Sequence, residues 1–528
     1  MSSSFHTGQR LSFESQLCTV RYIGEVKGTK GEWLGVEWDD STRGKHSGEH
    51  NGTKYFECKV PGAGSFVRPN RPHDVPNTFL QGLKEKYIAN LEASGIPKPI
   101  IFGTKAAEEV GFDKISKKFS ELDTLRSVIL DYMKINVCDD DLEEISATCA
   151  NARELNLSCN LFEDFEQVTK ICFSLPKVES LTINGNRFAK VQIAEKYAHG
   201  FSKIKTLKAE DLRSTWAELF ELVDSFTNVV DLSLAVGDLQ KLAPTIKPQI
   251  SELRIANRLE SICLEEHAIE TLIDLEDLQR LPCLRRLLLA RNKIRTVYST
   301  AANSNADDKL CFPSVTFLDV SNNQIDDWKF LDDIRTAFPK LESLRIGQNP
   351  LYNNGSSGGM FQITVGRLHH NVTTLNFSVI KSAERADAEL FYISTIVKEL
   401  SEKPVEQEAD ILSRHTRWQE LQSLHGEQTI NRDSSQKPKD ALASRLIEVE
   451  VSRGSKTLLK KFPRNVTIGK LSGLIGRLFG ANPLDISLYL IEDGIGENGV
   501  RETMLVDELR ELDYYVVDAN AKLAVRDK

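Results

Sequence analysis

The feature that most constrains the fold is an internal repeat in the middle of the chain. The pattern Leu-x-Leu-x-x-Asn-x-apolar, with Ile or Val allowed at the second Leu, occurs in full five times. These copies run from Leu155 to Phe162, Leu181 to Phe188, Leu287 to Ile294, Leu318 to Ile325 and Leu344 to Leu351. Looser copies begin at Val128, Leu207, Leu232, Leu253 and Leu375, so successive copies are mostly 25 to 31 residues apart.

This period is typical of an α/β leucine-rich-repeat solenoid. The apolar residues of each copy are expected to point into the core, and the Asn amide to bond backbone groups where the chain leaves the strand. We predict the solenoid over residues 121–400, with a helix at 386–400 capping its open end. Its concave face is a candidate partner surface, with mid-strand residues Asn156, Thr182, Arg254, Leu288, Asp319 and Arg345.

Glycine marks a different region at the N-terminus. Nine of the 31 glycines lie between Gly24 and Gly64, separated by the β-type runs TVRYIGEV, EWLGVEW, TKYFECK and GSFVRP. Short strands with a glycine turn every few residues predict a small all-β barrel over residues 1–75. Residues 76–120 are interpreted as a linker.

The last 84 residues change character again. Strands are expected at LIEVEV and TLLKKFP, a helix after the N-cap Thr467, and further strands at 486–491 (ISLYLI) and 514–517 (YYVV). The order β-β-α-β-β predicts an α+β ubiquitin-like β-grasp over residues 445–528. Residues 401–444 are charged and polar and are interpreted as a helical hinge. The chain is therefore expected to be multidomain.

Composition excludes several classes of function. The net charge of −9 over 528 residues argues against nucleic acid as a partner. Neither a signal peptide nor an apolar run of membrane-spanning length is present, so no membrane partner is expected. Nine cysteines without C-x-x-C pairs predict reduced thiols in a cytoplasmic protein, with no metal site and no cofactor.

One motif has the form of a dinucleotide fingerprint, Gly-x-Gly-x-x-Gly at residues 494–499. A fingerprint needs a helix directly after it within a βαβ unit, whereas here the chain ends 29 residues later. Glu492, Asp493 and Glu497 would also repel a pyrophosphate, so we interpret the segment as a loop. With no other catalytic motif in the sequence, we expect a binding protein and not an enzyme.

The best candidate for binding is the segment Gly44-Lys45-His46-Ser47-Gly48, which presents a cation and an imidazole on a glycine loop. Aromatic residues and one further cation lie nearby in sequence: Trp33, Trp38, Phe56, Phe66 and Arg68. Aromatic walls beside a basic loop suit a short acidic peptide that ends in an aromatic residue and a carboxylate. The alternative is that the aromatic residues only fill a small core.

Residues 24–69 resemble a CAP-Gly domain, through Trp33-Leu-Gly-Val-Glu-Trp-Asp, the Gly44–Gly48 loop, Tyr55-Phe-Glu-Cys and Gly64-Ser-Phe-Val-Arg-Pro. The resemblance implies that this loop, which is Gly-Lys-Asn-Asp-Gly in the family, binds the acidic, aromatic-ended tails of α-tubulin and related proteins. His46 stands here in place of the family asparagine, and Ser47 in place of the aspartate.

The order CAP-Gly, leucine-rich repeats and ubiquitin-like domain resembles the tubulin-folding cofactor E family (tubulin-specific chaperone E). This resemblance implies a cytoplasmic, cytoskeleton-associated chaperone that binds α-tubulin and the αβ-tubulin heterodimer. It would act with other tubulin-folding cofactors in post-chaperonin folding, assembly and dissociation of the heterodimer. The ubiquitin-like domain would contact tubulin, another cofactor or the proteasome.

Two alternatives from other classes stay open. One is a microtubule-associated CAP-Gly linker, although such proteins usually carry long heptad coiled coils and none is visible in this sequence. The other is a ubiquitin or proteasome adaptor, which leaves the CAP-Gly loop without a role.

Overall fold

The structure is a computed structural model of the whole chain, in which residues 5–89, 122–234, 250–298, 310–353, 357–428, 430, 446–493, 500–515 and 521–527 are described. The chain divides into two compact units. The first comprises Met1–Leu351 and Thr374–Ser378, and the second Tyr352–Thr373 and Val379–Lys528. All nine cysteines are free thiols. Among the described helices, none combines the length and the apolar character needed to cross a membrane.

The first unit begins with a small β domain. Its antiparallel sheet has the order β1 (Arg10–Phe13), β2 (Gln16–Glu25), β3 (Glu32–Trp38), β6 (Gly64–Val67). The segment that was expected to form a strand around TKYFECK contributes only β5 (Thr53–Lys54), which pairs with β4 (Glu49–His50). Leu11, Phe13, Val20, Leu34, Val36 and Trp38 form the core of this domain.

The start of the predicted linker is part of the fold. Strand β7 (Asn77–Thr78) pairs with β9 (Ile135–Val137), and helix α1 (Phe79–Lys84) follows, with η2 (Glu85–Ala89) after it. Thr78 caps α1 in a capping box with Gln81, and Phe79, Leu80 and Leu83 are buried. Burial of the apolar face of α1 explains why residues 77–89 are part of the folded domain and do not form a linker. The rest of the predicted linker, residues 90–121, lies outside the described residues.

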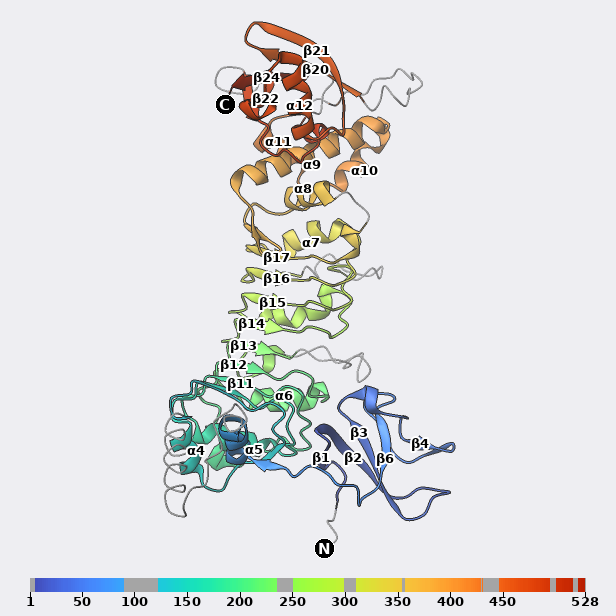
Figure 1. Cartoon of the computed structure of the whole chain (residues 1–528), viewed down its shortest axis with the longest axis vertical. Coiled ribbons are helices and arrows are strands. Elements are labelled where there is room, and N and C mark those ends of the chain that lie inside the picture. Colours follow the sequence, from blue (N-terminus) through green and yellow to red (C-terminus); the bar gives the residue numbers. More distant parts are fainter. Residues whose placement is uncertain are drawn as a thin grey trace, which may run out of the picture. The chain divides into compact units, whose positions relative to one another are not determined.

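An eleven-stranded sheet forms the solenoid (Figure 1). Its repeat strands pair in parallel, each in register with the next, so that Leu155, Leu181 and Leu207 are aligned. The strands are β8 (Ser127–Ile129), β10 (Glu154–Asn156), β11 (Ser180–Thr182), β12 (Thr206–Lys208), β13 (Asp231–Ser233), β14 (Ser261–Cys263), β15 (Arg286–Leu288), β16 (Phe317–Asp319), β17 (Ser343–Arg345), β18 (Thr374–Leu375) and β19 (Ser378–Val379).

Short helices return the chain between these strands. They are α4 (Leu142–Thr148), α5 (Phe165–Ser174), η3 (Glu195–Tyr197), α6 (Trp216–Asp224), η5 (Ile250–Glu252), η6 (Leu272–Arg280), α7 (Lys329–Ala337) and η7 (Pro350–Tyr352). Their apolar residues, such as Phe165, Leu222 and Ile334, are buried, as are the leucines of the strands. The leucine-rich-repeat architecture that the period predicts is thereby confirmed.

The repeat asparagines form a hydrogen-bonded ladder between copies. The Nδ2 of Asn323 donates to the carbonyls of Leu289 in the preceding copy and Val320 in its own, both at 3.0 Å. Its Oδ1 accepts from the backbone N–H of Ile294, also at 3.0 Å. Asn160, Asn186, Asn292 and Asn349 repeat this arrangement. Each buried amide therefore satisfies backbone groups that the turn leaves unpaired.

The loose copy predicted at Leu253 is wrong, because residues 250–252 form the short helix η5 and the strand lies at Ser261–Cys263. In the true copy, Ile262 and Leu264 fill the leucine positions and His267 fills the asparagine position. His267 Nε2 lies 2.7 Å from the carbonyl oxygen of Leu234 in the preceding copy. The histidine replaces the amide, which is why the asparagine pattern did not reveal this copy. Arg254 consequently lies on no strand.

The second unit begins with a helical layer made of α8 (Ser357–Arg367), α9 (Ser382–Glu402), η8 (Val405–Gln407), α10 (Glu408–Ser413) and α11 (Trp418–His425). The predicted capping helix corresponds to α9. Arg417 is buried and donates to the carbonyls of Gly366 (2.7 Å) and Leu368 (2.8 Å) and to Glu389 (3.0 Å). The segment interpreted as a charged hinge is thus packed against α9 as far as the end of α11. Residues 429 and 431–445 lie outside the described residues.

A five-stranded sheet completes the second unit, in the order β21 (Lys456–Pro463), β20 (Leu446–Arg453), β24 (Ala521–Asp527), β22 (Ile486–Asp493), β23 (Val500–Met504). β20 and β24, the first and last of these strands along the chain, are parallel neighbours at the centre of the sheet. Helix α12 (Ile468–Phe479) buries Leu471 and Ile475 in the core of this domain, and the short η10 (Pro483–Asp485) leads into β22. This is the predicted ubiquitin-like β-grasp.

The strand predicted at 514–517 is wrong, because Leu512–Tyr515 form the short helix α13 and the last strand is β24. Tyr514 stacks on Phe391 of α9 with ring centroids 5.4 Å apart. This packing overrides the β preference of the tyrosines. The Gly-x-Gly-x-x-Gly segment, residues 494–499, lies outside the described residues.

Candidate peptide-binding site

The glycine loop of the β domain is fixed to strand β6 by its backbone. The N–H groups of Lys45 and His46 donate to the carbonyl of Gly64, at 2.7 and 3.2 Å, and the N–H of Gly64 donates to the carbonyl of His46 at 2.7 Å. A Cβ at Gly44 would lie 1.9 Å from the carbonyl oxygen of Gly62. Gly48 has φ +108° and a Cβ there would lie 2.1 Å from the carbonyl oxygen of Phe56. Both glycines are therefore required for this loop path.

An aromatic cluster lies beside the loop. Phe66 is at its centre, with ring centroids 5.0 Å from His46, 5.5 Å from Phe56, 5.6 Å from Tyr55 and 6.4 Å from Trp33. The cluster comprises Tyr22, Trp33, His46, His50, Tyr55, Phe56 and Phe66. Most of the contacts are edge-to-face, an arrangement that holds the rings in fixed orientations.

Phe56 forms the floor of the aromatic cluster, since it is only 7% exposed. Its ring fits against Gly35 of β3, where a Cβ would lie 2.4 Å from the ring. The other rings of the cluster are half-buried. A partner side chain would therefore meet ring faces and edges above a closed apolar base.

His46 is oriented by the loop itself. The N–H of Gly48 donates to its Nδ1 at 3.0 Å, so Nδ1 is the unprotonated nitrogen and Nε2 carries the proton in the neutral ring. Partial burial lowers the pKa of His46 below its usual range, against the opposing effect of Glu49. At neutral pH the ring is therefore an uncharged donor through Nε2.

Two cations accompany the cluster. Lys45 is exposed, and within the described part of the chain its ammonium has neither a hydrogen-bond nor an ion-pair partner. Arg68 places its guanidinium 3.6 Å from the centroid of the Trp33 ring and donates to the carbonyl of Lys30 at 2.6 Å. Trp33 in turn donates from Nε1 to Thr29 at 2.8 Å. Lys45 is thus free to pair with an anion, whereas Arg68 is positioned by its own contacts.

The structure brings together all but one of the residues predicted for this site. Trp38 is the exception, because it is 2% exposed and packs in the core against Phe13, with centroids 6.0 Å apart. For this residue the core-filling alternative is correct. Ser47 lies in the loop, but its Oγ accepts from the N–H of Gly62 at 2.9 Å, which makes it a support of the loop.

Three cluster residues were missed by sequence reasoning: Tyr22, His50 and Tyr55. Tyr22 follows a β-bulge in β2, which turns its side chain toward Tyr55 and Phe66. Tyr55 directly precedes Phe56, so its position in the sequence was an available signal. His50 stands in the short strand β4, and no sequence signal distinguished it.

Comparison with known proteins gives consistent matches. A family model described as the CAP-Gly domain matches residues 7–72. Tubulin-specific chaperone E of Rattus norvegicus is 30% identical over 534 residues, which cover 98% of each chain. Tubulin-folding cofactor E of Arabidopsis thaliana is 28% identical over 509 residues, covering 93% of each.

A solved structure titled as the C-terminal ubiquitin-like domain of mouse tubulin-specific chaperone e is 22% identical, with a TM-score of 0.15. It covers 19% of this chain and 95% of that chain. The β-grasp assignment of residues 446–527 accordingly rests on their strand order.

Proposed function

This chain belongs to the tubulin-specific chaperone E family, and we propose that it is a tubulin-folding cofactor that binds α-tubulin. In this role it takes part in post-chaperonin folding, assembly and dissociation of the αβ-tubulin heterodimer. The observation that carries the proposal is the similarity to tubulin-specific chaperones over 98% of both chains. The loop and aromatic cluster supply a chemically suited site for the α-tubulin tail.

The proposed recognition uses three kinds of contact. The Lys45 ammonium pairs with a carboxylate of the tail, and His46 Nε2–H donates to a second oxygen. The aromatic cluster, with Arg68 beside Trp33, receives the terminal aromatic side chain. Charge-assisted hydrogen bonds are worth about 1.5–3 kcal/mol each, so the tail alone would bind weakly.

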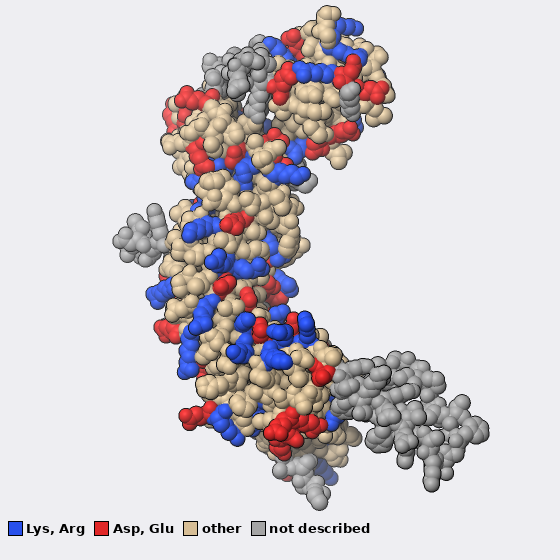
Figure 2. All heavy atoms as spheres, turned by 90° about the vertical axis from the view of Figure 1, so that its left-hand side faces the viewer, with Lys and Arg blue, Asp and Glu red and all other residues tan. Residues whose placement is uncertain are grey.

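A second contact would therefore raise the affinity through the linked domain. We place it on the face of the solenoid sheet, where Lys208 and Arg286 are exposed on their strands and Arg345 pairs with Asp319 at 2.7 Å. Figure 2 shows Lys and Arg side chains gathered across the middle of the molecule. Several predicted mid-strand residues are register partners on neighbouring strands. Asn156 pairs with Thr182, and Asp319 stands between Leu288 and Arg345.

The proposed activity needs no catalysis by this chain. Binding and release of tubulin subunits make and break noncovalent contacts only. Within the described residues, no group of three or more His, Cys, Asp or Glu side chains is placed to hold a metal ion. We propose that the protein acts in the cytoplasm and at the cytoskeleton with other tubulin-folding cofactors, and that the ubiquitin-like domain docks a cofactor, tubulin or the proteasome.

The test mixes full-length protein with αβ-tubulin and follows the subunits by analytical size exclusion. We expect loss of the heterodimer peak and elution of α-tubulin with the chain, with a weaker effect for the double variant Lys45→Ala, His46→Ala. Lys54→Ala is the matched control, because Lys54 is an exposed lysine of the same domain outside the loop.

Two outcomes would contradict the proposal. Intact heterodimer together with co-sedimentation on polymerised microtubules would favour the microtubule-associated CAP-Gly linker. Intact heterodimer without any binding, even when the other tubulin-folding cofactors are added, would remove tubulin as the partner.

A further inference from the structure

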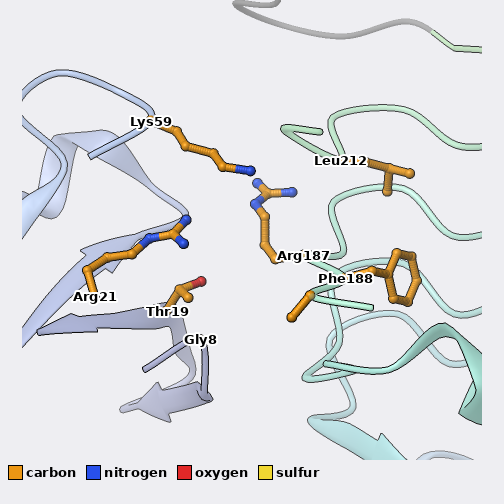
Figure 3. Close-up of a pocket in the computed structure, with 8 residues that line it drawn as sticks. Gly8, Thr19, Arg21, Lys59, Arg187, Phe188 and Leu212 are labelled. Carbon is orange, nitrogen blue, oxygen red and sulfur yellow. The ribbon is translucent and has the colours of Figure 1, made fainter. Parts of the chain in front are cut away.

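A cavity of about 50 Å³ lies between the N-terminal β domain and the repeats, both within the first unit. Its lining includes Thr19, Arg21 and Lys59 from the β domain and Arg187, Phe188 and Leu212 from the repeats (Figure 3). Three cationic side chains thus approach one small cavity from two sides. None of the three belongs to the glycine loop or the aromatic cluster.

The carboxylates around this cavity are already engaged. Glu37 accepts from Arg21 Nε at 2.8 Å and from the N–H of Val60 at 3.0 Å. Asp39 accepts two hydrogen bonds from Arg10, at 2.8 and 2.6 Å. Both carboxylates therefore already have close partners within the β domain.

On the repeat side, Asp211 accepts from Arg187 Nη2 at 3.0 Å. Arg213 donates to the backbone carbonyl of Asp39 at 2.6 Å. Glu218, which raises the pKa of Lys59, accepts at the start of helix α6 from the N–H of Thr215 at 2.7 Å. Five cations, Arg10, Arg21, Lys59, Arg187 and Arg213, therefore face the carboxylates of Glu37, Asp39, Asp211 and Glu218, together with Glu163, which accepts from the N–H of Arg10 at 3.0 Å.

Two of the cations remain incompletely paired. Lys59 Nζ donates to the carbonyl oxygen of Arg213 at 2.6 Å, and it has no carboxylate partner within the described chain. Arg187 is 8% exposed, and its Nε has no hydrogen-bond partner and lies 3.8 Å from Asp39 Oδ1. Burial lowers the pKa of both side chains, and Arg21 lowers that of Lys59 further. Lys59 is exposed, whereas Arg187 is buried, and a positive charge that is buried without full compensation is costly.

We propose that this cavity binds one oxyanion group, a carboxylate or a phosphate, between Arg21, Lys59 and Arg187. An oxyanion offers several acceptor oxygens to donors that converge from different directions. Phe188 and Leu212 exclude water on one side, which strengthens each charge-assisted hydrogen bond. Since the donors come from both the β domain and the repeats, the bound anion also holds these two parts together.

The experiment titrates the full-length chain by calorimetry with inorganic phosphate, at constant ionic strength adjusted with chloride. A parallel titration uses a short oligoglutamate peptide with an amidated C-terminus. Binding of phosphate alone identifies a free anion as the source, and binding of the peptide identifies an acidic protein segment. Because the loop at Gly44–Gly48 is itself proposed to bind an acidic tail, either result supports the cavity only when Lys59→Met weakens it, and failure of both to bind would overturn the proposal.

Lys59→Met tests the location of the site. Within the chain, loss of the Lys59 ammonium leaves only the backbone carbonyl of Arg213 without its donor, so the fold should tolerate the substitution. We expect about tenfold weaker binding, equivalent to 1.4 kcal/mol. Lys54→Met, on β5 away from the cavity, should bind like the unmodified chain. Equal affinities of the two variants would contradict the assignment, and thermal unfolding of each variant establishes that it is folded.

Hydrogen exchange gives a second, independent readout on the unmodified chain. Phosphate should slow exchange in the segments that contain Lys59 and Arg187 and leave the loop at Gly44–Gly48 unchanged. Slower exchange confined to the loop would place the anion there instead and would overturn the proposal.

Discussion

The asparagine ladder of the solenoid and the aromatic cluster of the β domain use polar groups in opposite ways. In the ladder, each Asn side chain is buried and both its donor and its acceptor are paired, as for Asn323. At the cluster, the Lys45 ammonium has no partner in the described chain, and His46 uses only Nδ1 within the loop. Paired buried groups stabilise one conformation, whereas exposed groups left unpaired are available to a ligand. Substitutions should therefore separate stability from binding.

The largest effect is expected from Asn323→Ala. The substitution removes the buried hydrogen bonds from Nδ2 to the carbonyls of Leu289, Val320 and Ser321 and leaves the N–H of Ile294 without its acceptor. We expect a loss of about 3–4 kcal/mol in the free energy of unfolding of the first unit, measured by urea denaturation. Asn257→Ala, at an exposed position in a turn, should change it by less than about 0.5 kcal/mol. Similar losses in both variants would show that the ladder contributes little.

Gly48→Ala should disturb both properties at once. The new Cβ would meet the carbonyl oxygen of Phe56 in a left-handed backbone conformation, so the loop must move. We expect the β domain to lose about 2–3 kcal/mol and tail-peptide binding to fall below detection in fluorescence anisotropy. Gly52→Ala is the control, since Gly52 also has positive φ but open space around its Cβ position. Retained peptide binding in Gly48→Ala would contradict the assigned loop geometry.

Lys45→Ala should affect binding alone. The ammonium has no hydrogen-bond or ion-pair partner within the described chain, so the midpoint of thermal unfolding should stay within about a degree of the unmodified value. Loss of one charge-assisted contact should weaken binding of an acidic, aromatic-ended peptide by about tenfold or more. Anisotropy with Lys54→Ala as control measures this effect. A lowered unfolding midpoint with unchanged affinity would place Lys45 in the structure and not in the site.

The smallest effect concerns His267, the ionisable member of the ladder. Burial lowers its pKa to about 4, from an ordinary value near 6.5 in the unfolded chain. Between these values the unfolded chain binds more protons, so stability falls as the pH falls from about 6.5 to 4. Because the side chain is partly exposed, we expect a loss of only about 1 kcal/mol between pH 7 and pH 5.

His267→Asn should remove this part of the pH dependence, since an amide restores the ladder without a titrating group. Urea denaturation at pH 7 and pH 5 compares the two chains. Identical pH dependence in both would show that His267 does not titrate on unfolding.

The sequence allowed prediction of those parts in which one residue type recurs at fixed spacing. The leucines and asparagines defined the strands of the solenoid, since only that register buries both. The copy at Ser261–Cys263 escaped because His267 stands at the asparagine position and contacts the carbonyl of the preceding copy, as asparagine Nδ2 does in the other copies. Identity at a single position was the wrong criterion there, and hydrogen-bonding capacity would have been the right one.

Tertiary packing decided the features that could not be predicted. Trp38 and Phe66 are both aromatic residues near the loop, and packing against Phe13 places Trp38 in the core with Val36 and Leu34. Tyr22 reaches the cluster through a β-bulge, which local sequence does not announce. Arg417 lies in a charged segment yet is buried. Its guanidinium donates to Gly366 on α8, to Leu368 just after α8 and to Glu389 on α9.

The asparagine position has a mechanical consequence. In a repeat array each copy contacts only its neighbours, so a pulling force reaches every junction equally and the weakest one yields first. Leu212 occupies this position in the copy that follows the run Asn160–Asn186 and precedes the run Asn292–Asn349, and a leucine cannot bridge backbone groups of adjacent copies. Stretched from its two ends, the solenoid would part between these runs, and each half would keep its own strands until a higher force is applied.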